Sequence, residues 1–209
     1  MARLPANERK AQLLDTAARV FAKRGYAGAT TAELAEAAGV SEPIIYRHFK
    51  SKKDLFIALV ELTGQDTLSL WEHELASAPT PSARLERLIK TNPMLAESGR
   101  LRYSVIIAAM AEVEEPEVRQ ALQVHLETLH AFIAREVRRA QEAGVVSKRF
   151  SPELSAWMLI EIAIGFGALA GLGMSKHGHD STGTAVDEVI TAVMLRGGIG
   201  QGPTAKHEQ

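Results

Sequence analysis

Side chains that could contact a polyanion are concentrated in one stretch of the chain, residues 30–54. Hydroxyl, imidazole and ammonium groups can bind phosphate oxygens, and here they belong to Thr30, Thr31, Tyr46, His48, Lys50 and Lys52. Glu42 could accept a hydrogen bond from cytosine, and Arg47 could donate to guanine. Pro43 and Ile44 could make only apolar contacts, for example with a thymine methyl group. A solvated helix surface is the alternative interpretation for each of these side chains, so the elements that position them decide between the two.

Two short helices joined by a tight turn would position these side chains. Thr30 and Glu33 have the spacing of a capping box, which begins a helix. Gly39 follows where the chain must turn, because glycine adopts a positive φ without steric cost. Ser41 can cap a second helix that has Pro43 in its first turn. The residues expected to face inward are Leu34, Ala35, Ala38, Ile45 and Phe49. Such a unit buries one side and presents the other, as a helix-turn-helix does when its second helix enters the DNA major groove.

This stretch closely resembles the N-terminal DNA-binding domain of the TetR family of bacterial transcriptional regulators. The residues that carry the resemblance are Gly25-Tyr26, Thr30-Thr31, Leu34-Ala35, Ala38-Gly39-Val40-Ser41, Ile45-Tyr46-Arg47-His48-Phe49 and Lys50-Ser51-Lys52-Lys53-Asp54-Leu55-Phe56. The resemblance implies that the candidate phosphate ligands above have that role, and that Ser41 lies among the DNA contacts at the start of the recognition helix. It also implies a homodimer, because two symmetric heads read two half-sites of a pseudo-palindromic operator. Repression relieved by a small-molecule effector is the implied default, and an activator remains an alternative.

Charge is distributed unevenly along the 209 residues, whose formal net charge is −1. The segment 1–55 has ten basic and six acidic residues, a net charge of +4, and the remainder has 14 basic and 19 acidic residues, a net charge of −5. A positive head on a negative body suits a protein that presents one end to phosphate. The chain has no cysteine, which excludes disulfides and thiol catalysis and is compatible with the cytoplasm. The N-terminus has no apolar run of signal-peptide length, and we expect a cytoplasmic protein.

The helical periodicity predicts an all-α fold with about nine helices. We expect a helix-turn-helix domain over residues 1–50, a helical ligand-binding and dimerisation domain over residues 51–196, and a flexible tail over residues 197–209. The helix that begins at Ser51 carries an apolar stripe well beyond the head, so we interpret it as the strut that joins the head to the body.

Residues 156–174 are apolar nearly all round and have three possible interpretations. A membrane span has the required length, but Glu161 lies within the segment and no basic flank sets an orientation. The spacing Gly165, Gly167 and Gly171 does not make a nucleotide-binding loop, because no strand precedes it. The third interpretation is a helix buried against its own core and against a second copy of the chain. The resemblance implies a four-helix bundle of this kind, built from residues 151–176 and 184–196 of each subunit.

Effector sites in helical bodies lie between helices and combine apolar walls with a few polar groups. The candidate residues are Trp71, Tyr103, Met110, His125, Phe132, Trp157, Met158 and Glu161. Ordinary core packing is the competing interpretation for each of them. His177 to Asp180 resembles a metal-binding sequence only superficially, and we predict no metal and no cofactor. We also expect no enzymatic activity, since no nucleophile–base motif emerges. A DNA-binding architectural protein without an effector is a further alternative.

Overall fold

The computed structural model describes residues 5–174, 178–179 and 184–196. Within these residues the chain forms nine α-helices and no strand, apart from one isolated bridge between His179 and Ala185. The all-α prediction is therefore confirmed. The helices are α1 (Ala6–Gly28), α2 (Thr31–Ala38), α3 (Glu42–His48), α4 (Lys52–Ala76), α5 (Pro81–Lys90), α6 (Glu97–Met110), α7 (Pro116–Glu142), α8 (Pro152–Gly171) and α9 (Val186–Arg196). The tail and the loop residues His177 and Asp180 lie outside the described part of the chain.

Hydroxyl side chains begin several helices as the sequence suggests. The Thr30–Glu33 capping box is present, and the Ser51 hydroxyl accepts a hydrogen bond of 3.0 Å from the Asp54 amide. The expected Ser41 cap is wrong, because the Ser41 side chain makes no capping hydrogen bond. An N-cap hydroxyl usually accepts from the second or third helical amide. Pro43 occupies the second position and has no N–H, while the Ile44 amide donates to the Ser41 carbonyl at 2.9 Å.

The head is a small three-helix unit closed by the start of α4. Its centre is an aromatic cluster in which Phe21 meets Phe56 edge to face at 5.1 Å and Tyr26 lies 4.6 Å from Phe56, measured between ring centroids. Gly25 has φ 71° and interrupts α1 there, as glycine in the left-handed region commonly does near a helix end. The aromatic rings and the aliphatic residues of α1, α2 and α3 form one continuous core, which gives α3 a rigid floor.

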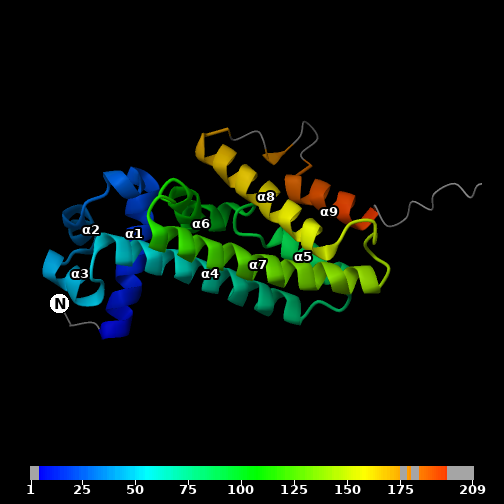
Figure 1. The fold of residues 1–209 in the computed structure, drawn as a ribbon, viewed down its shortest axis with the longest axis horizontal. Coiled ribbons are helices and arrows are strands. Elements are labelled where there is room, and N and C mark those ends of the chain that lie inside the picture. The colour runs from blue at the N-terminus through cyan, green and yellow to red at the C-terminus, as the bar shows by residue number, and fades with distance from the viewer. Residues whose placement is uncertain (1–4, 175–177, 180–183, 197–209) are drawn as a thin grey trace, which may run out of the picture.

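The long helices α4 and α7 join the head to the far end of the body, and α4 runs out of the head without interruption (Figure 1). At the far end, Arg84 of α5 makes two hydrogen bonds to the buried carboxylate of Glu136 on α7, at 2.8 and 3.1 Å. The same guanidinium donates to the Leu75 carbonyl at 2.7 Å, so α4, α5 and α7 are tied together. On the other side, α6 packs along α1 and connects the body to the head.

Helices α8 and α9 both lie along the upper side of the view in Figure 1, where α9 packs on α5. Among the described residues, α8 is the one helix that is long and apolar enough to cross a membrane, and 28% of its most apolar window is buried. Its inner face packs on α7 and α6. Its outer face carries exposed side chains at helical spacing: Leu154, Trp157, Met158, Glu161, Gly165, Ala168, Leu169 and, at the C-cap, Leu172. Val189 and Val193 of α9 are also exposed, so both helices present apolar residues to solvent.

Candidate nucleic-acid interface and effector cavity

The recognition helix α3 is held by two buried apolar residues and by the turn that precedes it. Ile45 and Phe49 are 1% and 3% exposed, respectively, and belong to the head core, as predicted. Gly39 has φ 64°, the left-handed conformation expected at the end of α2, and the Val40 amide then donates to the Ala35 carbonyl at 3.0 Å. The opposite side of α3 is consequently directed outward.

That outward side contains the side chains expected to reach bases. Glu42, Pro43 and Arg47 are exposed, and Ile44 is half-buried. Ser41 is exposed as well, and its hydroxyl is available for an external partner because it makes no capping bond. The four residues 41–44 form the first turn of α3 and its approach, which is the part of a recognition helix that contacts base edges.

A second group of side chains extends this surface onto α2. The Tyr46 hydroxyl donates to Thr31 Oγ1 at 3.4 Å, so the phenol of α3 lies beside the first residue of α2. Thr30 is exposed, but its hydroxyl donates to Glu33 Oε2 at 3.2 Å and accepts from the Glu33 amide at 3.2 Å. The capping box therefore occupies the Thr30 side chain. Its neighbour Thr31 is the better-placed hydroxyl for a phosphate oxygen.

The basic residues at the start of α4 differ in orientation. Lys50 is exposed, and its backbone amide donates to Asp54 Oδ2 at 3.0 Å. The Lys52 ammonium donates instead to the carbonyls of Tyr26 and Ala29, at 2.8 and 2.9 Å, and lies 4.4 Å from the Tyr26 ring centroid. Two of its three N–H donors thus stabilise the end of α1. His48 is half-buried at the C-terminal end of α3.

Lys53 connects the head to the body. Its ammonium contacts Glu115 at 3.2 Å and Glu117 at 3.0 Å, at the corner where α7 begins. The hydrogen bonds that Lys53 donates to Glu117 and Glu115 raise the pKa of its ammonium, and the bond from Lys53 lowers the pKa of the Glu117 carboxyl. The body is therefore connected to the head at two places, by the packing of α6 on α1 and by these ionic contacts of Lys53.

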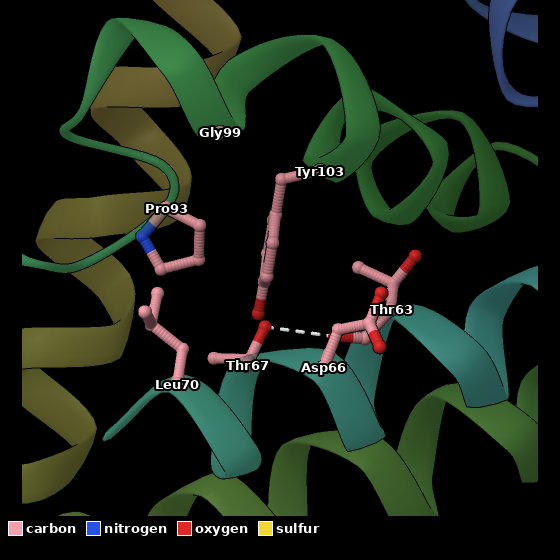
Figure 2. A pocket seen from close by; sticks show the side chains of 7 residues that line it. All are labelled: Thr63, Asp66, Thr67, Leu70, Pro93, Gly99 and Tyr103. Atoms are coloured by element: carbon pink, nitrogen blue, oxygen red, sulfur yellow. Dashed lines mark hydrogen bonds between the residues drawn. The ribbon is translucent and has the colours of Figure 1, made fainter. Parts of the chain in front are cut away.

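A cavity of about 360 Å³ lies between α4 and α6 (Figure 2). It is lined by Thr63, Asp66, Thr67, Leu70, Pro93, Gly99 and Tyr103. Figure 2 shows Tyr103 reaching from α6 toward the α4 face that carries both threonines and Asp66. Three of the four polar side chains in this wall were not among the sequence candidates. These three residues are spaced three and four positions apart, which places them on one helix face, and this spacing was the available signal for a site. Threonine is common on helix surfaces, so the spacing does not single out a ligand site.

Two of the predicted effector residues contact each other, and one of them, Tyr103, lines this cavity. The Tyr103 hydroxyl and His125 Nε2 are 2.8 Å apart, and both side chains are buried. Burial raises the pKa of the Tyr103 phenol and lowers that of the His125 imidazole to about 4, so both groups are neutral near pH 7. His125 lies directly against α4, because a Cβ atom added at Gly64 would be 2.6 Å from His125 Nδ1. It also lines a neighbouring cavity of about 260 Å³ between α4 and α7.

The other predicted effector residues are spread over the body. Trp71 and Phe132 stack on each other with their ring centroids 5.5 Å apart and belong to the core. Met110 is half-buried at the end of α6. Trp157, Met158 and Glu161 lie on the exposed outer face of α8, and Trp157 stacks on His130 at 4.5 Å. The structure therefore does not bring these three together with Tyr103 and His125.

Comparison with known proteins agrees with this geometry. Residues 13–59 match the family described as bacterial regulatory proteins, tetR family. The transcriptional activator FasR of Mycolicibacterium smegmatis is 34% identical over 125 residues, which cover 60% of this chain and 57% of FasR, less than two thirds of its length. The transcriptional regulator TtgR of Pseudomonas putida is 32% identical over 148 residues, covering 66% of this chain and 70% of TtgR.

The fold comparison extends over nearly the whole chain. The fatty acid degradation regulator FadR of Bacillus halodurans superimposes with a TM-score of 0.73 at 18% identity, covering 93% of this chain and 97% of FadR. That identity supports the fold alone, whereas the TtgR match combines 32% identity with 70% of the length of TtgR. The chain belongs to the TetR family of bacterial transcriptional regulators.

Proposed function

We propose that this chain is a homodimeric, cytoplasmic transcriptional repressor that is released from a pseudo-palindromic operator by a small molecule. The observation that carries the proposal is the continuity of α4. One helix begins beside the recognition helix, at Lys52, and lines the cavity further along, at Thr63, Asp66 and Thr67. A ligand that favours one position of α4 would shift the two heads relative to each other, as coupling between two sites requires.

The outer face of α8 and α9 supports a homodimer. Leu154, Leu172 and Val193 are each more than half exposed, and they extend along both helices. Contiguous exposed apolar surface of this kind is typical of an interface with another protein. A two-fold axis through residues 151–176 and 184–196 would cover it with the same face of a second copy. Glu161 lies within this face and would then need a polar partner from the second subunit.

The DNA-binding part of the proposal divides the exposed residues of the head into two groups with different roles. Thr31, Tyr46 and Lys50 would contact phosphates and fix the orientation of α3. Glu42 and Arg47, with the apolar contacts of Pro43 and Ile44, would read bases. Half-sites recognised by such a dimer would be about 34–36 Å apart, one turn of the duplex.

An activator is the second candidate, because FasR is named a transcriptional activator. The head and the cavity are compatible with either outcome. An architectural protein without an effector is less well supported, since a ligand-sized cavity with buried polar groups lies beside α4.

Selection of binding sequences from random duplex DNA, followed by transcription of a template carrying the selected site, tests the proposal. We expect the protein to lower transcription and a releasing compound to restore it. Increased transcription would replace the repressor with the activator. Failure to select any sequence would contradict the proposed function itself.

A further inference from the structure

A basic hollow lies between the start of α1 and the recognition helix α3. It has a volume of about 360 Å³ and is lined by Ala6, Arg9, Gly39, Val40, Ile44, Arg47 and His48. Among the described residues, two guanidinium groups, one imidazole and no carboxylate therefore line this space. The four residues that precede Pro5 include an arginine and no acidic residue, so they cannot supply a negative charge to it. The hollow is consequently attractive to an anion.

Arg9 is positioned at the hollow by two successive hydrogen bonds. Its guanidinium donates to Gln12 Oε1 at 2.6 Å, and Gln12 Nε2 donates to the Ala38 carbonyl, at the end of α2, at 3.5 Å. The bond to Gln12 uses one of the five N–H donors of Arg9, and within the described part of the chain Arg9 has no carboxylate partner. A half-buried guanidinium that is already held in place loses less conformational entropy when it binds an anion.

The hollow lies on the flank of α3 that is opposite to Tyr46. Successive residues of an α-helix are rotated by about 100°, so Ile44 and His48 each point about 160° away from Tyr46. Tyr46 contacts Thr31 at the start of α2, whereas Ile44 and His48 line the hollow beside α1. Arg47 lies between the two flanks, about 100° from Tyr46 and from His48. The recognition helix therefore has hydrogen-bonding groups on both flanks.

The width of the major groove gives these two flanks a common purpose. A helix with its side chains is about 10–12 Å across, and the major groove of B-DNA is about 12 Å wide. A recognition helix inside the groove thus has a phosphate backbone close to each flank. The proposed function places Thr31 and Tyr46 against one backbone. The other flank would meet the second strand, and there it presents the basic hollow.

We propose that this hollow binds a backbone phosphate of the second DNA strand, with the Arg9 guanidinium as the main ligand and His48 as a further donor. The inference rests on the proposed function and extends its DNA-binding surface from α2 and α3 to the start of α1. The planar guanidinium fork matches the geometry of a phosphate, and its charge strengthens each hydrogen bond. Arg47, between the flanks, keeps the base contact that the proposed function gives it.

The competing interpretation is that Arg9 only stabilises the start of α1 through its bond to Gln12. The two interpretations differ in salt dependence. A side chain that neutralises a phosphate releases counterions from the DNA, so its loss reduces the dependence of affinity on salt. A hydrogen bond within one helix has no such effect.

Binding of the full-length protein to a random-sequence duplex, between about 50 and 200 mM salt, measures this dependence. For Arg9→Met we expect the slope of log K against log salt to become shallower by about 1.8, because a dimer loses two contacts. The affinity at fixed salt should fall about tenfold or more. Arg9→Lys keeps the charge and is expected to retain a slope close to that of the wild type.

Arg19→Met is the matched control. Arg19 belongs to the same helix, pairs with Asp15 and lies outside the hollow. Its loss changes the net charge of the chain as much as the loss of Arg9 does. We expect the wild-type salt slope for this variant.

Neutral methylphosphonates, placed one at a time along both strands of a selected site, locate the contact. In each half-site, the wild type should be weakened by replacements on both strands. Arg9→Met is expected to become insensitive to one of these replacements, and Tyr46→Phe to one on the opposite strand.

A wild-type salt slope in Arg9→Met overturns the inference, and so does an equal change in Arg19→Met or in Arg9→Lys. Insensitivity of Arg9→Met and Tyr46→Phe to replacements on the same strand also overturns it. Each of these results leaves the proposed function intact, because the wild-type protein still binds DNA. A wild-type protein that binds no duplex would end both.

Discussion

Replacement of Lys52 with methionine tests whether this lysine holds the head together or contacts DNA. The sequence placed Lys52 among the phosphate ligands, whereas its ammonium donates to the carbonyls of Tyr26 and Ala29. Lys50, two residues away, is exposed and serves as the matched variant. Methionine keeps most of the length of the side chain and removes the charge and all three donors.

The expected loss of stability follows from the two charge-assisted hydrogen bonds. Each is worth about 1.5–3 kcal/mol, but Lys52 is only half-buried, and the two released carbonyls can bind water. We therefore expect Lys52→Met to lower the free energy of unfolding by about 2 kcal/mol, which is a fall in Tm of about 4–8 °C for a chain of this size. Lys50→Met is expected to change stability by less than about 0.5 kcal/mol.

Binding to generic duplex DNA at several salt concentrations supplies the second measurement. Loss of one phosphate contact lowers the slope of log K against log salt by about 0.9, so a dimer that loses two contacts changes by about 1.8. We expect this change for Lys50→Met and an almost unchanged slope for Lys52→Met. A Lys52→Met protein of wild-type stability with a reduced salt slope would refute the assignment of Lys52 to the interior of the head.

Further predictions concern the body. Arg84→Met is expected to cost about 3 kcal/mol of unfolding free energy in urea titrations, the low end for a broken buried ion pair, because Arg139 and Arg135 still contact Glu136. Burial acts to raise the pKa of the Glu136 carboxyl, but its arginine partners outweigh burial and lower that pKa. The stability from the Arg84–Glu136 pair is therefore present above pH 4.5 and is lost on acidification below pH 4.5. Gly64→Ala is expected to destabilise the protein by about 1–3 kcal/mol despite the better helix propensity of alanine, since the new methyl group would meet His125 at 2.6 Å. Because burial lowers the pKa of His125 to about 4, the imidazole is protonated below pH 6.5 only in the unfolded chain. Stability should therefore fall by up to about 1.4 kcal/mol per pH unit between pH 6.5 and 4, and this contribution should be missing from the double variant Tyr103→Phe/His125→Leu.

The head could be predicted from the sequence because its signals are local. The Thr30–Glu33 capping box, the left-handed Gly39 and the inward Ile45 each depend on residues within one or two turns. Ser41 is the N-cap residue of α3, but its hydroxyl makes no capping bond: Pro43 removes the second helical amide, and the third, that of Ile44, donates to the Ser41 carbonyl instead. The division into domains at residue 50 stays a prediction; that boundary lies in the short connection between α3 and α4, which begins at Lys52.

The site in the body could not be predicted in the same way, because its contacts join residues far apart in the chain. Nothing near Glu136 in the sequence indicates that Arg84 will meet it. The spacing from Leu129 and Ile133 places position 136 on the inner face of α7, but a glutamate by its charge is expected on the surface. Similarly, Lys52 lies two residues from the exposed Lys50, and only its contacts with the end of α1 distinguish the two lysines. Trp157 and Glu161 looked like pocket residues because α8 is apolar on all sides, and a single chain gives no way to tell the inner from the outer face.

The mass of the complex with a selected DNA site, measured by sedimentation, tests the central claim most directly. The proposed homodimer, which is argued from the outward α3 and the exposed apolar residues of α8 and α9, would place two chains on one site, with inverted half-sites about 34–36 Å apart. The selected sequence should show that inverted repeat, and Tyr46→Phe with Lys50→Met should weaken the complex without changing its stoichiometry. A single chain bound to a site without inverted symmetry would contradict the account.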